Sequence, residues 1–308
     1  MPPSRPLLAL AWMLGAVASF TMMAISGRAI QVEMNTFELM LYRSVIGFLI
    51  VALLVGASPA GLAQIRTLHI GLHVKRNLWH FAGQNLWFFA LTAIPLAQLV
   101  AIEFTNPLWV ALLAPLMLGE RLTWIKRGAA LVGFAGVMIV AQPGAAPVEI
   151  GHAAGLLAAI GFAMNTIYTK QIMRFDGVLC VLFWMTLAQS VMALALALPG
   201  GIPLPSPATA PWVVVVALTG LSAHFCLTSA LGLAPASVVA PMEFLRLPAI
   251  TLVGVWLYGE PMSAVVLAGA LVIVAANLVT LRAERISASQ ARSRAQAEPA
   301  ARALPPSP

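Results

Sequence analysis

Apolar runs of roughly 20 residues alternate with short polar loops along most of the chain. As an α-helix, a run of that length covers the roughly 30 Å of hydrocarbon in a bilayer. The shorter alternation of apolar and polar positions that is typical of a transmembrane β-barrel is missing from the sequence. The pattern therefore predicts an all-α integral membrane protein with ten transmembrane helices. We expect the spans at residues 7–27, 36–55, 78–94, 97–118, 125–142, 151–171, 178–198, 212–231, 238–257 and 263–281.

One stretch of the sequence occurs twice, at residues 90–120 and again at residues 230–260. Three anchors recur 140 residues apart, namely Pro95 with Pro235, Glu103 with Glu243, and Gly119-Glu120 with Gly259-Glu260. Such self-similarity indicates a duplicated structural unit. Because each half holds an odd number of spans, the second half must enter the membrane upside down. We therefore predict two inverted five-helix repeats, 1–145 and 146–281, followed by a disordered basic cytoplasmic tail, 282–308.

Composition agrees with a membrane protein, since 61% of the residues are hydrophobic and only 9% are charged. A soluble globular domain carries about 25% charged residues. The net charge of +7 could suggest nucleic acid binding, but the basic residues lie in loops between spans and in the tail. They are better interpreted as topology signals, so we expect no nucleic acid partner.

The distribution of lysine and arginine among the loops predicts the orientation of the chain. With the N-terminus in the cytoplasm, Arg28 is the one cation that stays in an external loop. The basic residues of all the other short loops and of the tail then lie inside. The first span resembles a signal peptide with a cleavage site at Ala16-Val17-Ala18, but cleavage would leave the first repeat one helix short. We expect an uncleaved first span and two cytoplasmic termini.

Each copy of the repeated stretch holds a carboxylate inside an apolar run. Arg43 lies about seven residues into the second span and Glu103 about six residues into the fourth, so both are roughly 10 Å deep from the outer side. An ionisable group within a membrane is costly to insert and is a functional candidate by default. We expect Arg43 and Glu103 to form a salt bridge. It either takes part in substrate or proton handling or only locks two helices together.

The second half has a similar pair near the cytoplasmic side. Glu243 lies about five residues into the ninth span, and Arg246 is one turn deeper on the same face. These two either pair with each other, or Arg246 binds an anionic group of a substrate. Asn106 occupies the position equivalent to Arg246, so the two halves differ chemically. His224 and Asn165 are second-rank candidates, and we expect intramembrane amides such as Asn277 to form interhelical hydrogen bonds.

Glycine and proline mark the ends and breaks of the repeated helices. Gly119 and Gly259 suit left-handed helix caps, and the glutamate after each suits the dipole of the next helix. Prolines at 107, 115, 241 and 248 interrupt the backbone hydrogen bonding of the fourth and ninth spans. Freed backbone groups are tolerated in a membrane only where they face protein or a cavity. We therefore expect a cavity beside the glutamates.

Motifs of membrane-embedded enzymes are missing from the sequence, including H-E-x-x-H, G-x-S-x-G and a phosphate-binding loop. Ser222 and His224 are two residues apart on a helix and do not face each other. Cys180 and Cys226, the two cysteines, lie far apart inside apolar runs, and we expect them to be packing residues. We predict no enzyme activity, no cofactor and no metal site.

Several segments together resemble the EamA-type branch of the drug/metabolite transporter superfamily. They are Tyr42-Arg43-Ser44, FFALTAIPLAQLVAIEFTNPLW leading to LMLGERLTW, GAALVGFAGVMIV, and APASVVAPMEFLRLP leading to GEP. The resemblance extends over nearly the whole chain up to residue 282. It implies a ten-helix inverted-repeat carrier in a bacterial inner membrane that moves small metabolites by alternating access. Branches similar in the APMEFLRLP segment handle amino acid derivatives, S-adenosylmethionine or riboflavin.

The sequence therefore predicts a secondary transporter for a small metabolite, such as an amino acid derivative, a vitamin or a nucleoside-like compound. Its partners would be the substrate, the lipid bilayer and, as a candidate coupling ion, the proton, with the protein acting as a monomer or a homodimer. We expect the cavity to be lined by Arg43, Glu103, Asn106, Glu243 and Arg246. The alternative is a non-catalytic subunit of a membrane complex.

Overall fold

The computed structural model describes residues 6–118, 124–142, 149–233, 242 and 245–302. In these residues the regular structure is helical, and no strand occurs. The α-helices are α1 (Pro6–Ile30), α2 (Thr36–Ala57), α3 (Ile70–Ala93), α4 (Leu96–Glu103), α5 (Asn106–Leu118), α6 (Trp124–Ala141), α7 (Ile150–Ile172), α8 (Val178–Ala197), α9 (Ala210–Leu233), α11 (Arg246–Tyr258) and α12 (Ala264–Arg302). Two short 3₁₀ helices, η1 (Gly61–Ile65) and η2 (Leu198–Gly200), lie in loops.

The helices confirm the predicted fold class. Among the described residues, five helices are long and apolar enough to cross a membrane, and three shorter apolar helices accompany them. The fourth span is divided between α4 and α5. The third span begins at Ile70 rather than at the predicted residue 78, because polar residues such as Arg76 and Asn77 are buried between helices instead of being solvated.

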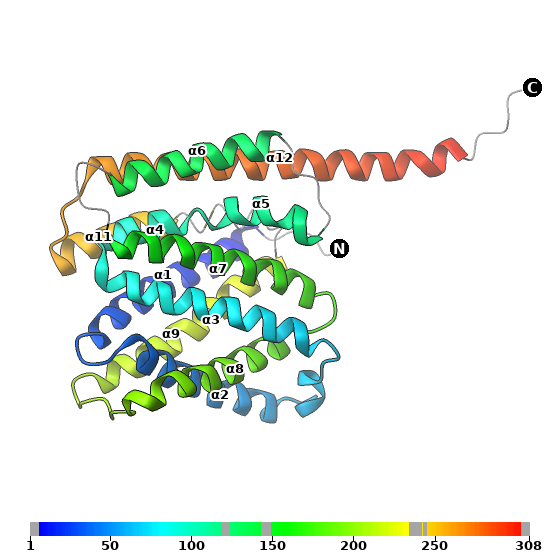
Figure 1. Ribbon diagram of the computed structural model, residues 1–308. Helices are drawn as coiled ribbons and strands as arrows, with labels where there is room; N and C mark the ends of the chain where they lie inside the picture. Colours follow the sequence, from blue (N-terminus) through cyan, green and yellow to red (C-terminus); the bar gives the residue numbers. More distant parts are fainter. Residues whose placement is uncertain (1–5, 119–123, 143–148, 234–241, 243–244, 303–308) are drawn as a thin grey trace, which may run out of the picture.

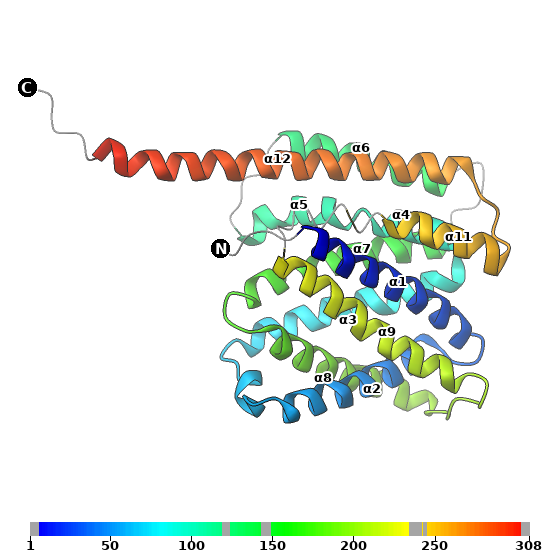
Figure 2. The same cartoon turned by 180° about the vertical axis from the view of Figure 1, so that it is seen from behind.

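The packing of the helices has the symmetry of an inverted repeat (Figures 1 and 2). The main pairs are α1 with α9, α3 with α7, α2 with α8 and α6 with α12. A two-fold axis that maps α1 onto α7 and α9 onto α3 converts the first pair into the second. The same axis maps each of the other two pairs onto itself. Such an axis in the membrane plane is the geometry that the odd number of spans per repeat requires.

The bundle is layered, with α6 and α12 along one face and α2 and α8 along the opposite face (Figures 1 and 2). Between these faces lies an apolar core in which Phe88, Leu91 and Leu99 are almost completely buried. Helices α6 and α12 approach closely. A Cβ atom added to Gly136 would lie only 2.9 Å from the carbonyl oxygen of Gly269. Small residues at helix crossings permit this contact in membranes.

The break between α4 and α5 is held by polar contacts. Pro107, in the first turn of α5, lacks the N–H that would continue the helix, as the sequence predicts. The carbonyl oxygen of Phe104 accepts a hydrogen bond of 2.6 Å from the side-chain nitrogen of Asn277 on α12, which is fully buried. The predicted interhelical hydrogen bond of Asn277 is thus confirmed. It satisfies a backbone acceptor at the break.

Gly259, near the end of the second repeated stretch, tests the predicted helix cap. This residue ends α11 with a φ of +63°, which confirms the left-handed cap. Gly119 and Glu120 lie outside the described residues. The tail differs from the prediction of disorder, because α12 continues to Arg302 and extends beyond the body of the bundle (Figure 1). Alanine, arginine, glutamate and glutamine dominate this segment and are all good helix formers.

Candidate functional site

An ion pair joins the two repeats through Glu103 and Arg246. The Glu103 Oε1 atom lies 2.6 Å from Arg246 Nη2, and both side chains are largely buried. The other carboxylate oxygen accepts a hydrogen bond of 2.8 Å from the indole nitrogen of Trp87 on α3. Glu103 ends α4 and Arg246 begins α11, so each charge lies at a helix terminus inside the protein.

Two aromatic rings lie beside Arg246. Its guanidinium carbon lies 5.1 Å from the ring centre of Phe20 and 5.5 Å from that of Phe104, both within the range of a cation–π interaction. We call Phe20, Trp87, Glu103, Phe104 and Arg246 the Glu103 cluster. A positive charge at a helix N-terminus is opposed by the helix dipole, so the carboxylate and the aromatic faces compensate a placement that is otherwise unfavourable.

The Glu103 cluster lies near the middle of the bundle. Helix α4 has 8 residues before its break and α11 has 13. At 1.5 Å per residue, Glu103 is about 12 Å and Arg246 about 20 Å from the end of the bundle where α4 starts and α11 finishes. These depths bracket the midpoint of a 30 Å hydrocarbon layer.

The predicted salt bridge between Arg43 and Glu103 is wrong, because Arg246 is the partner of Glu103. The prediction compared depths within one repeat, and the contact is made between repeats. Glu243, predicted as a site residue and as a possible partner of Arg246, lies outside the described residues. Asn106 begins α5 beside the pair, and within the described part of the chain its side chain forms no hydrogen bond with Glu103 or Arg246.

Arg43 belongs to a second group of polar side chains. In the amide orientation that the hydrogen-bonding network requires, the Gln84 side-chain oxygen accepts from Arg43 Nη1 and Nη2, at 2.9 and 3.0 Å. The Gln84 nitrogen then donates to Gln189 on α8 at 3.1 Å, and Gln189 Nε2 donates to His80 Nδ1 at 3.0 Å. We call Arg43, Gln84, Gln189, His80 and His224 the Arg43 cluster. It connects α2, α3, α8 and α9.

Ring contacts link the two clusters. The His224 ring lies 5.4 Å from that of His80 and 6.0 Å from that of Phe20, each in edge-to-face geometry. Phe20 in turn faces Arg246. A continuous set of polar and aromatic side chains therefore runs from Arg43 to Arg246 through the interior. Asn165, the remaining candidate, lies on α7, and its buried Oδ1 atom has no hydrogen-bond partner among the described residues.

An ion pair lies at the end of the bundle where α1 and α11 finish. Arg28 Nη1 lies 2.5 Å from Glu260 Oε1, and Glu260 Oε2 accepts a hydrogen bond of 2.9 Å from the backbone N–H of Leu96. Arg28 also donates to the carbonyl oxygens of Leu91 and Ile94. We call Arg28, Glu260 and the backbone of residues 91–96 the Arg28 latch. The predicted role of Glu260 at a helix N-terminus is replaced by this contact.

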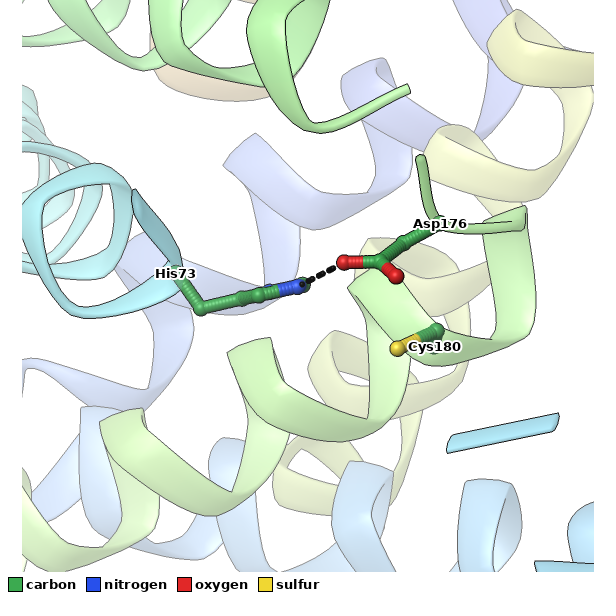
Figure 3. Close-up of side chains that lie close together, drawn as sticks. All are labelled: His73, Asp176 and Cys180. Carbon is green, nitrogen blue, oxygen red and sulfur yellow. Dashed lines mark hydrogen bonds and ion pairs between the residues drawn. The ribbon is translucent and has the colours of Figure 1, made fainter. Parts of the chain in front are cut away.

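The opposite end of α3 carries a different polar contact, shown in Figure 3. His73 Nε2 lies 2.9 Å from Asp176 Oδ2, and the hydroxyl of Thr67 donates to the same oxygen at 2.7 Å. Burial raises the pKa of the Asp176 carboxyl, but the hydrogen bonds from Thr67 and His73 outweigh it, so the pKa lies below its usual value.

Cys180 lies beside this contact, and the metal-binding atoms of His73, Asp176 and Cys180 are within 4.8 Å of one another. The spacing of these residues in the sequence gave no sign of such a group. Because His73 and Thr67 already satisfy one carboxylate oxygen, the contact ties the start of α3 to the α7–α8 loop without requiring an ion.

The sequence supplied some of these partners and missed others. The amides of Gln84 and Gln189 stand out in apolar runs, and Trp87 and Phe104 are large aromatic residues in the same part of the sequence. Arg28 offered a missed signal, because a lone external cation predicts an acidic partner at the same end of the bundle. The role of His80 and Phe20 depends on which faces of α1, α3 and α9 meet, and a single sequence does not define those faces.

Comparisons with known proteins agree with this architecture. The sequence profile of the EamA-like transporter family matches residues 7–142 and 149–282. A riboflavin transporter of Brucella anthropi is 32% identical over 229 residues, covering 72% of this chain and 80% of that protein. A riboflavin transporter of Rhizobium johnstonii is 27% identical over 282 residues, covering 92% and 93%.

A more distant relative and a solved structure extend the comparison. An S-adenosylmethionine uptake transporter of Rickettsia prowazekii is 25% identical over 278 residues, covering 90% of this chain and 94% of that protein. A solved crystal structure aligns with a TM-score of 0.62 at 19% identity, covering 90% of this chain and 98% of the other. At that identity the likeness shows the fold alone.

Proposed function

This chain belongs to the EamA-like transporter family and is a multi-pass membrane transporter for small metabolites. From that premise we propose that it works by alternating access and that both termini lie in the cytoplasm. The orientation is supported by the distribution of lysine and arginine among the loops. In this orientation the Arg28 latch faces outward, and the His73–Asp176 contact lies at the cytoplasmic end.

The single observation that carries the proposal is the ion pair between Glu103 and Arg246. In our proposal these two residues form part of the substrate site, together with Trp87 and the aromatic rings around Arg246. Inverted-repeat carriers bind substrate near the midplane, where the two halves meet and helices are interrupted. The pair has that depth, lies at the end of α4 and the start of α11, and takes one charge from each repeat.

Alternating access requires that one end of the carrier opens while the other stays closed. We assign the outward barrier to the Arg28 latch, because it joins α1, the α3–α4 junction and the end of α11. Opening that end would break the Arg28–Glu260 pair. The Glu103–Arg246 pair would be rearranged when substrate binds between its two charges.

The substrate class is proposed from the relatives and from the chemistry of the site. Proteins similar to this chain are named for riboflavin and for S-adenosylmethionine, each of which contains a planar heterocyclic ring system joined to a polar chain. A site of aromatic rings, a carboxylate and a guanidinium suits such molecules, because the rings stack and the charges orient the polar groups. We propose a heterocyclic metabolite of this type as the cargo.

A thermal-shift screen of the purified protein tests this proposal. The panel would include riboflavin, S-adenosylmethionine, nucleosides and amino acids. A ligand present at 100 times its Kd stabilises the folded state by about 2.7 kcal/mol. We expect a hit whose shift is lost in Glu103→Gln and Arg246→Gln. The matched control is Glu33→Gln, a carboxylate in the α1–α2 loop, and this variant should keep the shift. A hit that persists in both cluster variants would place the substrate elsewhere.

Proton coupling is part of the proposal and needs its own test. Glu103 is a largely buried carboxylate within a span, and its partner Arg246 belongs to the other repeat, so we assign the proton-carrying role to Glu103. Transport into vesicles should accelerate when a pH gradient is imposed, and Glu103→Gln should abolish that acceleration. Equal rates with and without the gradient would reject proton coupling and leave the carrier intact.

A further inference from the structure

The Arg43 cluster holds a buried positive charge, and in the part of the chain that the structure describes no carboxylate pairs with it. Arg43 is 6% exposed, and among the described residues it forms no ion pair. Its acceptors there are neutral, namely the amide oxygen of Gln84 and the Met40 sulfur, which lies 4.0 Å from Nη1. The guanidinium lies within a span, where an uncompensated charge is costly and is retained for function. A stable structural role would be met at lower cost by a neutral residue.

Two buried donors beside this charge lack acceptors. The Nε atom of Arg43 and the hydroxyl of Ser44 are both buried and have no hydrogen-bond partner. Both residues line one cavity between α2, α8 and α9, which Gln189 also lines. The cavity measures about 20 Å³, enough for about one water-sized group. Unmade hydrogen bonds at buried donors are expensive, so the site is built to receive an acceptor.

The space beside the guanidinium depends on Gly220. A Cβ atom at this position of α9 would lie 2.7 Å from Arg43 Nε and 2.8 Å from Arg43 Nη2. No other residue type would leave the guanidinium where it is. The lack of a side chain at Gly220 therefore leaves room for the Arg43 guanidinium.

From these observations we propose that Arg43 and Ser44 form a subsite for an anionic group, a carboxylate or a phosphate, on the transported molecule. The anion would accept from Arg43 Nε and the Ser44 hydroxyl while the Gln84 oxygen is released from the guanidinium. The inference rests on the proposed function, because the cavity must widen as α2, α8 and α9 separate during alternation. The ring contacts through His224 and Phe20 connect this subsite with the Glu103 cluster.

Arg76 provides the matched comparison inside the same protein. It is also a buried arginine without an ion pair among the described residues, at 4% exposure. Its Nε donates to Thr169 at 2.9 Å and its Nη1 to Asn77 at 2.8 Å, so its hydrogen bonds are made within the protein. Arg76→Gln therefore removes an equivalent buried charge without touching the cavity.

The first test uses small anions and does not depend on knowing the substrate. The thermal midpoint of the purified full-length protein is measured against acetate and against inorganic phosphate, at constant ionic strength made up with HEPES. We expect a saturable rise in the wild type and in Arg76→Gln, and none in Arg43→Gln. Ser44→Ala, which removes one donor and leaves the charge, should need about tenfold more anion. Equal responses in the wild type, Arg43→Gln and Ser44→Ala would overturn the subsite.

The second test asks whether the anion belongs to the substrate. Binding is compared within pairs that differ by one anionic group, namely riboflavin 5′-phosphate with riboflavin, and S-adenosylmethionine with its decarboxylated form. The wild type should prefer the anionic member of a pair by about 10- to 100-fold, and Arg43→Gln should lose that preference while still binding the neutral member. A response to acetate and phosphate without such a preference would overturn the substrate assignment and make a free anion the ligand.

The two failures can be distinguished. If a panel compound is bound and transported but anions act equally on the wild type and Arg43→Gln, the subsite fails and the proposed function stands. If the anion response depends on Arg43 but no metabolite is moved by the protein in liposomes, the proposed function fails.

Discussion

Weakening the Arg28 latch should open one end of the carrier. The substitution Glu260→Gln removes the negative charge while keeping a side-chain oxygen that can still accept from the Leu96 N–H. Arg28 keeps its two backbone acceptors, the carbonyls of Leu91 and Ile94. The variant should therefore fold and should lose mainly the charge attraction between Arg28 and Glu260.

The structure gives the size of the effect. The two side chains are 19% and 13% exposed, so the pair is neither a surface salt bridge nor fully desolvated. A hydrogen bond to a charged group contributes about 1.5–3 kcal/mol. If that free energy stabilises only the closed state, its loss shifts the ratio of closed to open molecules about 10- to 150-fold.

Thiol labelling measures this ratio. Ala97, near the start of α4, lines a cavity of about 60 Å³ together with Glu260. Ala97→Cys would be introduced in a background where the buried Cys180 and Cys226 are replaced by alanine. A membrane-impermeant maleimide is then added to right-side-out and to inverted vesicles. Labelling in Glu260→Gln should be about 10- to 150-fold faster than in the parent, and only from the face where the latch lies.

The control is Glu33→Gln at the same end of the bundle, which removes a carboxylate that contacts Ser206 and Thr209 instead of Arg28. Its labelling rate should equal that of the parent. Arg28→Gln should act like Glu260→Gln, and the double variant should add little, because both changes remove one interaction. A folded Glu260→Gln protein that is labelled no faster than the parent from either face would refute the latch.

Three further predictions concern stability. Gly136→Ala should lower the free energy of unfolding by about 1–3 kcal/mol, because the added carbon would lie 2.9 Å from a backbone oxygen across the α6–α12 crossing. Gly128→Ala on the same helix, with open space around it, is the matched control. Equal midpoints of the two variants in thermal unfolding would contradict the close approach of α6 and α12. Asn277→Leu should cost about 1–3 kcal/mol by removing the buried hydrogen bond to the carbonyl of Phe104, and an unchanged midpoint would exclude this role. The pKa of Glu33 lies below its usual value because Thr209 and Ser206 donate to its carboxylate, so its stabilising effect is complete above the unfolded pKa and is lost as pH falls through the folded one. Between pH 6 and pH 3 the wild type should therefore lose more thermal stability than Glu33→Gln, and parallel curves would show that the carboxylate contributes nothing.

The fold followed from the sequence because its determinants are local or periodic. Span lengths come from runs of apolar residues, the inversion from an odd number of spans per repeat, and the break after Glu103 from the nearby Pro107. The extent of α3 and the helical tail did not follow. The first depends on burial of Arg76 against α7, and the second on intrinsic helix propensity that the high charge of the segment obscured.

The candidate site was predicted residue by residue but not as pairs. Glu103 and Arg246 were identified because charges in apolar runs are conspicuous, yet Glu103 was given the wrong partner. The contact joins positions on opposite repeats, and its formation depends on how α4 and α11 approach each other. Likewise, Arg43 was singled out, but its neighbours Gln84 and Gln189 come from α3 and α8, whose facing surfaces only the folded bundle defines.

Transport by the purified chain alone tests the central claim most directly. The protein is reconstituted into liposomes, and uptake of the compound selected by the thermal-shift screen is followed by counterflow. We predict saturable uptake by the wild type and at least about a tenfold lower rate in Glu103→Gln, as expected when a charge-assisted contact at the site is lost. Uptake that occurs only when other membrane proteins are added, or that is undiminished in Glu103→Gln, would contradict a self-sufficient carrier with its site at the Glu103–Arg246 pair.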